Sequence, residues 1–249
     1  MKILCLSSIV LLLIGCNNDN DVTKKMVKNK IIESNFINDS IYHGVTKIYD
    51  SNYHLESKIT FSRGIRNGES VNYYMNGKIS DSSFYRAGLK NGYNYVFDST
   101  GQLIYINYFF YGHQFGEEFF FRNYRPYQYI FKNFEKKNIF SCGYDSIGIF
   151  AYSGEIINAT IYGTTVNKMP NYGLFAYFLN PPHVQIIYSL GVIQQKTNTN
   201  KKILVFDNKK FFIDTILSIP PVGWKYYISA EYNDSLNNLK KTYISTLEF

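Results

Sequence analysis

The side chains in this sequence that could do chemistry are spread thinly, and few of them share a spacing. No His-x-x-x-His, Cys-x-x-Cys or Glu-x-x-His pair is present to hold a metal ion around any of the histidines, His43, His54, His113 and His183. Glu117 and Glu118 are adjacent, so on a strand their carboxylates face opposite sides and cannot act as a paired acid and base. Cys142 would need a neighbouring base to act as a nucleophile, and a buried structural role is favoured. We therefore expect no catalytic residues, no metal and no cofactor, and an enzyme is the least supported class.

The residue with the clearest chemical assignment is Cys16. Lys2 precedes a mostly apolar run from Ile3 to Ile14, which is too short to span a bilayer and is typical of an export signal. The run ends in Leu13-Ile14-Gly15-Cys16, which resembles the lipobox of bacterial lipoproteins. That resemblance implies a signal peptide at 1–15, lipidation of Cys16 and attachment to a membrane through the lipid. The alternative is an ordinary secretory signal cut nearby, which would leave Cys16 free.

A second modification is suggested by a short motif that recurs along the chain. Asp-Ser or Asp-Thr followed by an aliphatic residue resembles the O-glycosylation acceptor that Bacteroidota use on exported proteins. The acceptors would be Ser40, Ser146, Thr215 and Ser235. The alternative is plain turn chemistry, because Asp-Ser is a common turn dipeptide and an aliphatic residue often begins the next strand.

The charge of the chain is positive but dispersed. The sequence contains 26 Lys and Arg against 19 Asp and Glu, a net charge of +7. Nucleic acid would call for a concentrated basic face, so we expect none as a partner. The exception is a column of basic residues that we predict to lie in loops at one edge of a repeat, namely Arg63, Arg66, Arg86 and Lys90. This column is the candidate binding patch for an acidic protein or polymer, with ordinary solvated turns as the alternative.

The elements that must position these residues are set by a 24-residue period of glycine. One series comprises Gly44, Gly68, Gly92 and Gly116, and a second comprises Gly64, Gly88 and Gly112. Such a period marks a stacked array. Each unit predicts a strand, a tight turn, a second strand and a Gly-x-x-x-Gly reversal, with Asn76-Gly77 as a type I′ hairpin turn. Aromatic columns at 49, 73, 97 and 121 and at 61, 85 and 109 are expected to stack into a narrow core.

The repeats resemble the MORN-repeat variant family. The matching stretches are Phe61-Ser-Arg-Gly64-Ile-Arg-Asn-Gly68, Tyr73-Tyr-Met-Asn-Gly77-Lys and Tyr85-Arg-Ala-Gly88-Leu-Lys-Asn-Gly92. The end units depart from the pattern, where Phe115 replaces Asn and Tyr53 replaces the turn glycine. Proteins with this array are often labelled antitoxins or lipoproteins, and the resemblance implies a scaffold for binding or spacing rather than a reaction.

The full chain reads as an all-β protein in four parts. After the signal, residues 16–39 are polar and predict a lipidated tether. Residues 40–139 form the repeat array, with a degenerate closing unit from about 125. Residues 140–249 contain eight β-rich runs separated by turn signals, which predict an antiparallel β-sandwich. This last part bears a weak resemblance to immunoglobulin-like and fibronectin-like domains, because the cysteine pair of true immunoglobulin domains is absent.

These features together favour a non-catalytic lipoprotein of the bacterial cell envelope. We expect it to be anchored in a membrane, with the outer membrane favoured, and to bind an envelope protein or polysaccharide through its repeat sheet. The alternatives are a glycan-binding accessory lipoprotein that uses exposed tyrosines, and an immunity or antitoxin-type protein.

Overall fold

The structure is a computed structural model, and it describes residues 22–145, 149–166, 169–194, 196–197, 199–206, 212–217, 220, 222–236 and 238–247. Cys16 and Ser146 lie outside these residues. The described chain is all β, as the sequence predicted. Its strands are β1 (Thr23–Val27), β2 (Lys30–Ile37), β3 (Ile41–Tyr49), β4 (Leu55–Ser62), β5 (Ile65–Tyr73), β6 (Ile79–Arg86), β7 (Leu89–Phe97), β8 (Leu103–Phe110), β9 (His113–Arg122), β10 (Arg125–Lys132), β11 (Asn138–Tyr144), β12 (Ile149–Gly154), β13 (Asn158–Val166), β14 (Met169–Tyr177), β15 (Val184–Gln194), β16 (Thr199–Val205), β17 (Phe212–Leu217), β18 (Trp224–Asp234) and β19 (Leu239–Thr246).

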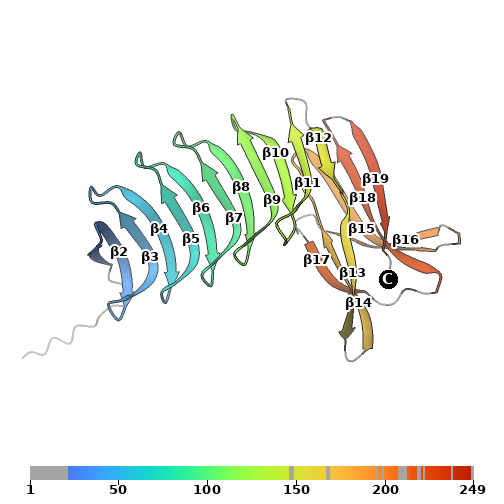
Figure 1. Cartoon of the computed structure of the whole chain (residues 1–249), viewed down its shortest axis with the longest axis horizontal. Helices are drawn as coiled ribbons and strands as arrows, with labels where there is room; N and C mark the ends of the chain where they lie inside the picture. The colour runs from blue at the N-terminus through green and yellow to red at the C-terminus, as the bar shows by residue number, and fades with distance from the viewer. Residues whose placement is uncertain are drawn as a thin grey trace, which may run out of the picture.

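Consecutive hairpins build one long antiparallel sheet. Strands β1 to β12 follow one another in sequence order across it, as the ladder in Figure 1 shows. The remaining strands form a three-stranded sheet, β13-β14-β17, and a four-stranded sheet, β16-β15-β18-β19. These two sheets lie at the β12 end of the ladder (Figure 1), and their pairings are antiparallel as well. No helix in the described residues is long and apolar enough to cross a membrane.

Within the repeats, the turns at the two opposite edges of the sheet differ. Arg63-Gly64 and Ala87-Gly88 both have positive φ at two central residues, the geometry of type I′. At the opposite edge of the sheet, between β5 and β6, Tyr74 and Lys78 close a three-residue loop in which Gly77 alone has positive φ. The prediction of a type I′ turn at Asn76-Gly77 is therefore wrong, because a type I turn followed by one left-handed residue also suits an Asn-Gly pair.

The second glycine of each pair lies inside a strand rather than in the reversal. Gly68 lies between Arg66 and Ser70, where the pairing of β5 with β4 shifts register, and on its other side it pairs with Tyr85 of β6. Its φ is +124°. A Cβ built there would lie 2.9 Å from Cβ of Thr60. Glycine is required at this bulge both for its backbone conformation and for the close approach of β4.

The segment 22–39, predicted as part of a tether, forms strands β1 and β2 instead. β2 pairs with β3, and β1 covers the edge of β2. Apolar side chains explain the difference, since Ile31 and Ile32 are buried against the sheet. The lysine-rich β1 forms the edge of the sheet, and charged edge strands resist unwanted strand pairing.

The buried core lies at one end of the molecule and not along the repeats. Its cluster begins at Phe115 and continues through β10, β11 and the two smaller sheets. The aromatic columns of the array are only partly buried, as at Tyr49, Phe61 and Tyr73. The narrow core expected from them is thus absent from the described array, because a single-layered sheet has no second layer to cover its rings.

The sheet also runs past the boundary that the sequence suggested at 139/140. β11 pairs with β10 and β12 pairs with β11, so residues 125–154 continue the ladder. The degenerate closing hairpin is real, but no linker follows it. The eight strands predicted after residue 140 are all present, and the first of them, β12, belongs to the long sheet.

Candidate functional site

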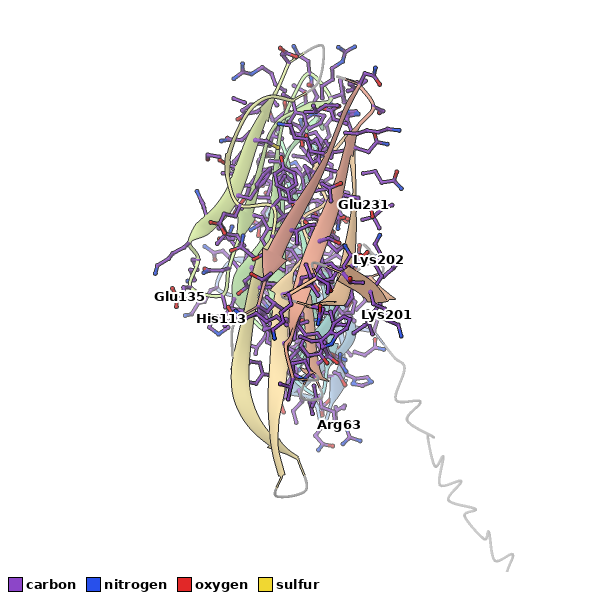
Figure 2. All side chains as sticks on the ribbon, turned by 90° about the vertical axis from the view of Figure 1, so that its right-hand side faces the viewer. Arg63, His113, Glu135, Lys201, Lys202 and Glu231 are labelled. Atoms are coloured by element: carbon purple, nitrogen blue, oxygen red, sulfur yellow. The ribbon has the colours of Figure 1, made fainter. Side chains whose placement is uncertain are left out.

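The basic column predicted from the sequence is split between turns and strands. Arg63 lies in the β4–β5 turn and extends outward from the array in Figure 2, and Arg86 ends β6. Arg66 and Lys90 lie within β5 and β7, so the prediction that they are loop residues is wrong. The reason is the length of the turn, since a type I′ hairpin uses two residues and the strand resumes at once.

Arg66 and Lys90 are held by aromatic rings of the next hairpin. The guanidinium carbon of Arg66 lies 5.2 Å from the ring centre of Tyr85, and the ammonium of Lys90 lies 5.1 Å from that of Phe109. These are cation–π distances. The register continues the row, because Phe61 pairs with Arg66 and Tyr85 pairs with Lys90. We call Phe61, Arg66, Tyr85, Lys90 and Phe109 the basic–aromatic stripe.

The sequence pattern predicts a core for these rings and loops for these cations, and does not predict their association. The signal was present in the spacing, since Arg66 to Tyr85 and Lys90 to Phe109 are both separated by 19 residues. The stripe repeats every two strands, which corresponds to a step of roughly 9.5 Å across the sheet.

The described carboxylates do not neutralise the positive charges of this surface. None of the four basic residues of the predicted patch forms an ion pair with a described carboxylate, and three of them, Arg63, Arg66 and Arg86, are exposed. Lys90 is half-buried and donates to Oδ1 of Asn94 at 3.0 Å. A surface with fixed, unpaired cations stacked on rings is suited to an anionic partner.

A row of small polar residues lies beside the stripe on the same face of the sheet. Asn94 donates to Asn107 at 2.9 Å, and the hydroxyls of Ser34 and Thr46 lie 2.6 Å apart. The row is buried between larger side chains and consists of Ser34, Thr46, Ser70, Ser83, Asn94 and Asn107. The Ser34–Thr46 and Asn94–Asn107 hydrogen bonds each join two neighbouring strands, so they help to fix the register that aligns the stripe.

Glu117 and Glu118 point to opposite faces of β9, as predicted. Glu117 accepts hydrogen bonds from the hydroxyls of Tyr93 at 3.0 Å and Tyr129 at 3.2 Å, and burial raises its pKa to about 7. Glu118 forms an ion pair with Lys132 at 2.8 Å on the other face. The two carboxylates therefore have separate environments and no shared substrate position.

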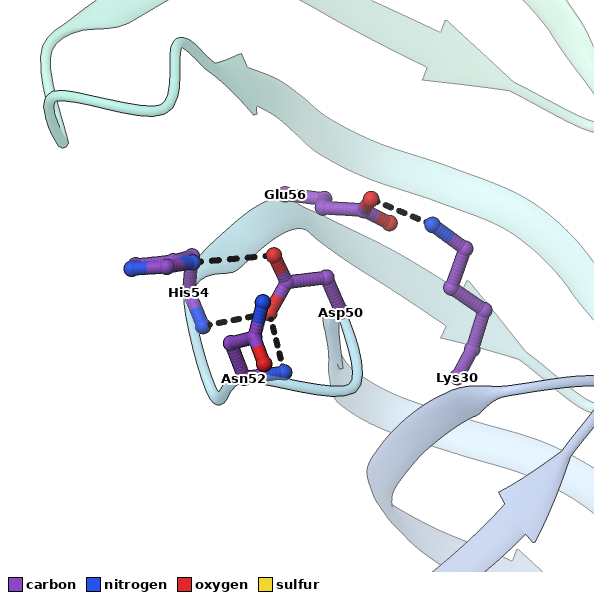
Figure 3. Close-up of polar contacts among 5 residues, drawn as sticks. All are labelled: Lys30, Asp50, Asn52, His54 and Glu56. Atoms are coloured by element: carbon purple, nitrogen blue, oxygen red, sulfur yellow. Dashed lines mark hydrogen bonds and ion pairs between the residues drawn. The ribbon is translucent and has the colours of Figure 1, made fainter.

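The remaining reactive side chains have structural surroundings. Cys142 is a buried free thiol that donates to the hydroxyl of Tyr144 at 3.2 Å, and burial raises its pKa to about 11. His54 contacts Asp50 at 2.9 Å inside the β3–β4 turn, and this contact is the main reason why the pKa of Asp50 is lowered (Figure 3). Within the described ranges, no three His, Cys, Asp or Glu residues gather as a metal site would require.

The glycosylation candidates that the structure describes occupy different settings. Ser40 and Ser235 are exposed in turns, whereas Thr215 is half-buried in β17. The turn around Ser235 also shows the competing explanation, because Oδ1 of Asp234 accepts a hydrogen bond from the backbone of Leu236 at 3.0 Å.

Comparison with known proteins adds no assignment to this geometry. Neither the scan of protein-family models nor the search of curated proteins found a match to this chain, so the MORN-repeat resemblance stays a prediction.

Proposed function

We propose that this protein is a membrane-anchored, non-catalytic lipoprotein of the bacterial cell envelope that binds an acidic protein or polymer through its repeat sheet. The observation that supports this proposal most directly is the basic–aromatic stripe. Its two cations, Arg66 and Lys90, form no ion pair with a described carboxylate, and each stacks on a ring of the following strand. Cations aligned across neighbouring hairpins suit a partner that is itself extended.

The anchor in this proposal rests on Cys16 and the apolar run before it. Cys16 and Thr23, the first residue of β1, are seven residues apart, and a fully extended chain of that length spans at most about 25 Å. A lipid on Cys16 would therefore hold the β1 edge of the sheet near the membrane surface. The repeat faces would stand within reach of other envelope components.

The stripe is tested by removing its two charges together with those of the neighbouring Arg63 and Arg86, without disturbing the fold. We expect the combined replacement of Arg63, Arg66, Arg86 and Lys90 by Ser to weaken capture of the partner in intact cells by cross-linking, and to reduce the salt dependence of that capture. The matched control carries the same loss of four charges on the C-terminal sheets, at Lys196, Lys201, Lys240 and Lys241.

Circular dichroism of both variants establishes that they are folded. The loss of two cation–π contacts at or near the surface should cost roughly 1–2 kcal/mol of stability, which a folded domain tolerates. Unchanged capture by the folded stripe variant, or equal losses in both variants, would contradict binding through the stripe.

A further inference from the structure

A second surface stands apart from the stripe, where the β9–β10 turn meets the C-terminal sheets. Two adjoining depressions of about 460 and 430 Å³ share Arg125, Pro126, Tyr144 and Asp145 as lining residues. The first also borders Arg122 and Tyr127, and the second borders Tyr124 and His183. We call this combined depression the junction cleft. Each of the two volumes lies within the range of small-ligand sites.

Two arginines oppose each other at the cleft. Arg122 and Arg125 are direct cross-strand partners flanking the β9–β10 turn. Neither forms an ion pair with a described carboxylate, although Arg122 stacks on Tyr127 at 4.8 Å. Like charges directly opposite one another destabilise a hairpin. A bound anion would relieve this repulsion.

Two residues at the cleft also have a positive φ, which is a strained backbone conformation for residues other than glycine. Tyr124 has φ of +62° in a two-residue turn with the same positive-φ geometry as Arg63-Gly64, where the second residue is glycine, and Tyr124 is 73% exposed. His183 has φ of +65° and its ring lies 6.2 Å from that of Tyr144. Non-glycine residues in this conformation cost stability, and such strain gathers at functional sites. The turn thus exposes an aromatic ring where glycine would be more stable.

From this combination we infer that the junction cleft binds an acidic saccharide, a sugar chain that carries carboxylates. Arginine recognises a carboxylate through paired, charge-assisted hydrogen bonds. The exposed ring of Tyr124 offers an apolar face on which a sugar ring can stack. A carboxylate such as Asp145 accepts hydrogen bonds from sugar hydroxyls.

An acidic peptide fits this cleft less well. β9 pairs with β8 and β10, and β10 pairs with β11, so neither strand at the cleft offers a free edge for a peptide to extend. Leu236 and Pro126 are the only aliphatic side chains among the described lining residues, so apolar anchoring of a peptide would be weak.

The test uses the full chain in detergent and isothermal titration calorimetry. The probes are trimers of galacturonic, glucuronic and mannuronic acid, the methyl esters of the same trimers, and triglutamate. We expect at least one triuronate to bind, and its uncharged methyl ester to bind at least tenfold more weakly. Triglutamate should bind at least tenfold more weakly than that triuronate.

Two variants separate a binding role from a structural one. Arg125→Gln should weaken triuronate binding about tenfold or more, and Tyr124→Gly should weaken it while raising the melting temperature, because glycine accepts the positive φ. The double variant Arg66→Gln/Lys90→Gln is the matched control and should bind the triuronate normally. This control keeps the result independent of the stripe and of the function proposed above.

The inference is overturned if no triuronate in the panel binds, if Arg125→Gln binds as tightly as the unmodified protein, or if triglutamate binds as tightly as the best triuronate. It is overturned as well if Tyr124→Gly keeps full affinity.

Discussion

Replacing Glu117 by Gln should remove a pH-dependent loss of stability from this protein. Glu117 is 3% exposed in β9, between the hydroxyls of Tyr93 and Tyr129. Burial is the largest influence on its carboxyl group and raises the pKa to about 7, against an ordinary value of 4.5, while the two hydrogen bonds oppose the rise. The folded state therefore binds this proton more tightly than the unfolded state does.

The sign and size of the effect follow from linkage. A carboxyl pKa that is raised by folding contributes stability below the unfolded value of 4.5, and this contribution is lost as the pH rises through 7. The difference between about 7 and 4.5, at 1.36 kcal/mol for each pKa unit, corresponds to about 3 kcal/mol. In a domain of this size that free energy shifts the melting temperature by roughly 6–12 °C.

The assay is thermal unfolding of the unmodified protein and of Glu117→Gln at several pH values from 4.5 to 8. Gln has nearly the same shape and does not titrate, so the difference between the two curves isolates Glu117 from the histidines that titrate in the same window. We expect the melting temperature of the Gln variant to rise relative to that of the unmodified protein as the pH rises. Parallel curves across the whole range would show that Glu117 keeps an ordinary pKa, and would refute the reasoning.

Two further predictions concern the anchor and the array. Cys16→Ser should release the protein from membranes or stall it as a precursor, which labelled fatty acid and membrane fractionation would show; a processed variant that stays bound contradicts lipidation. Gly68→Ala should destabilise the fold by a few kcal/mol because of its φ of +124° and the 2.9 Å approach to Thr60, whereas Gly77→Ala, with φ of +79° and open space around it, should cost only about 1 kcal/mol. Equal melting temperatures for the two alanine variants would contradict the bulge assignment.

The fold class could be predicted from the sequence because each repeat contains glycines at positions where the backbone requires them. Glycine at a fixed period and aromatic residues in phase leave few alternatives to stacked hairpins. The extent of the sheet could not be predicted, since β1 and β2 lack the glycine period and read as polar chain. Tyr53 shows the same limit, because it adopts φ of +65° where Gly77 stands in the next unit, and no residue propensity would suggest it.

The site was predicted less well than the fold. Sequence spacing placed Arg66 and Lys90 in one phase, but the partner of each cation lies one strand further on, and pairing across strands depends on the bulge at the second glycine. The junction cleft had no sequence signal at all. The pairing of β10 with β9 and β11 brings Tyr124 and Asp145 together, and His183 joins them only where the C-terminal sheets meet the ladder.

The distribution of burial explains how the array can keep its faces open. Before residue 115, the buried apolar residues of the described chain are Ile31, Ile32, Ile59 and Val71, and all the others follow. A repeat in such a sheet cannot stabilise itself and depends on its neighbours. The core at the C-terminal end therefore stabilises the sheet from that end, while the lysine-rich β1 forms the edge at the other end. Since this core supplies the burial, the array can hold cations and rings in register along a face that no other described strand covers. That arrangement is what a surface for an extended partner requires.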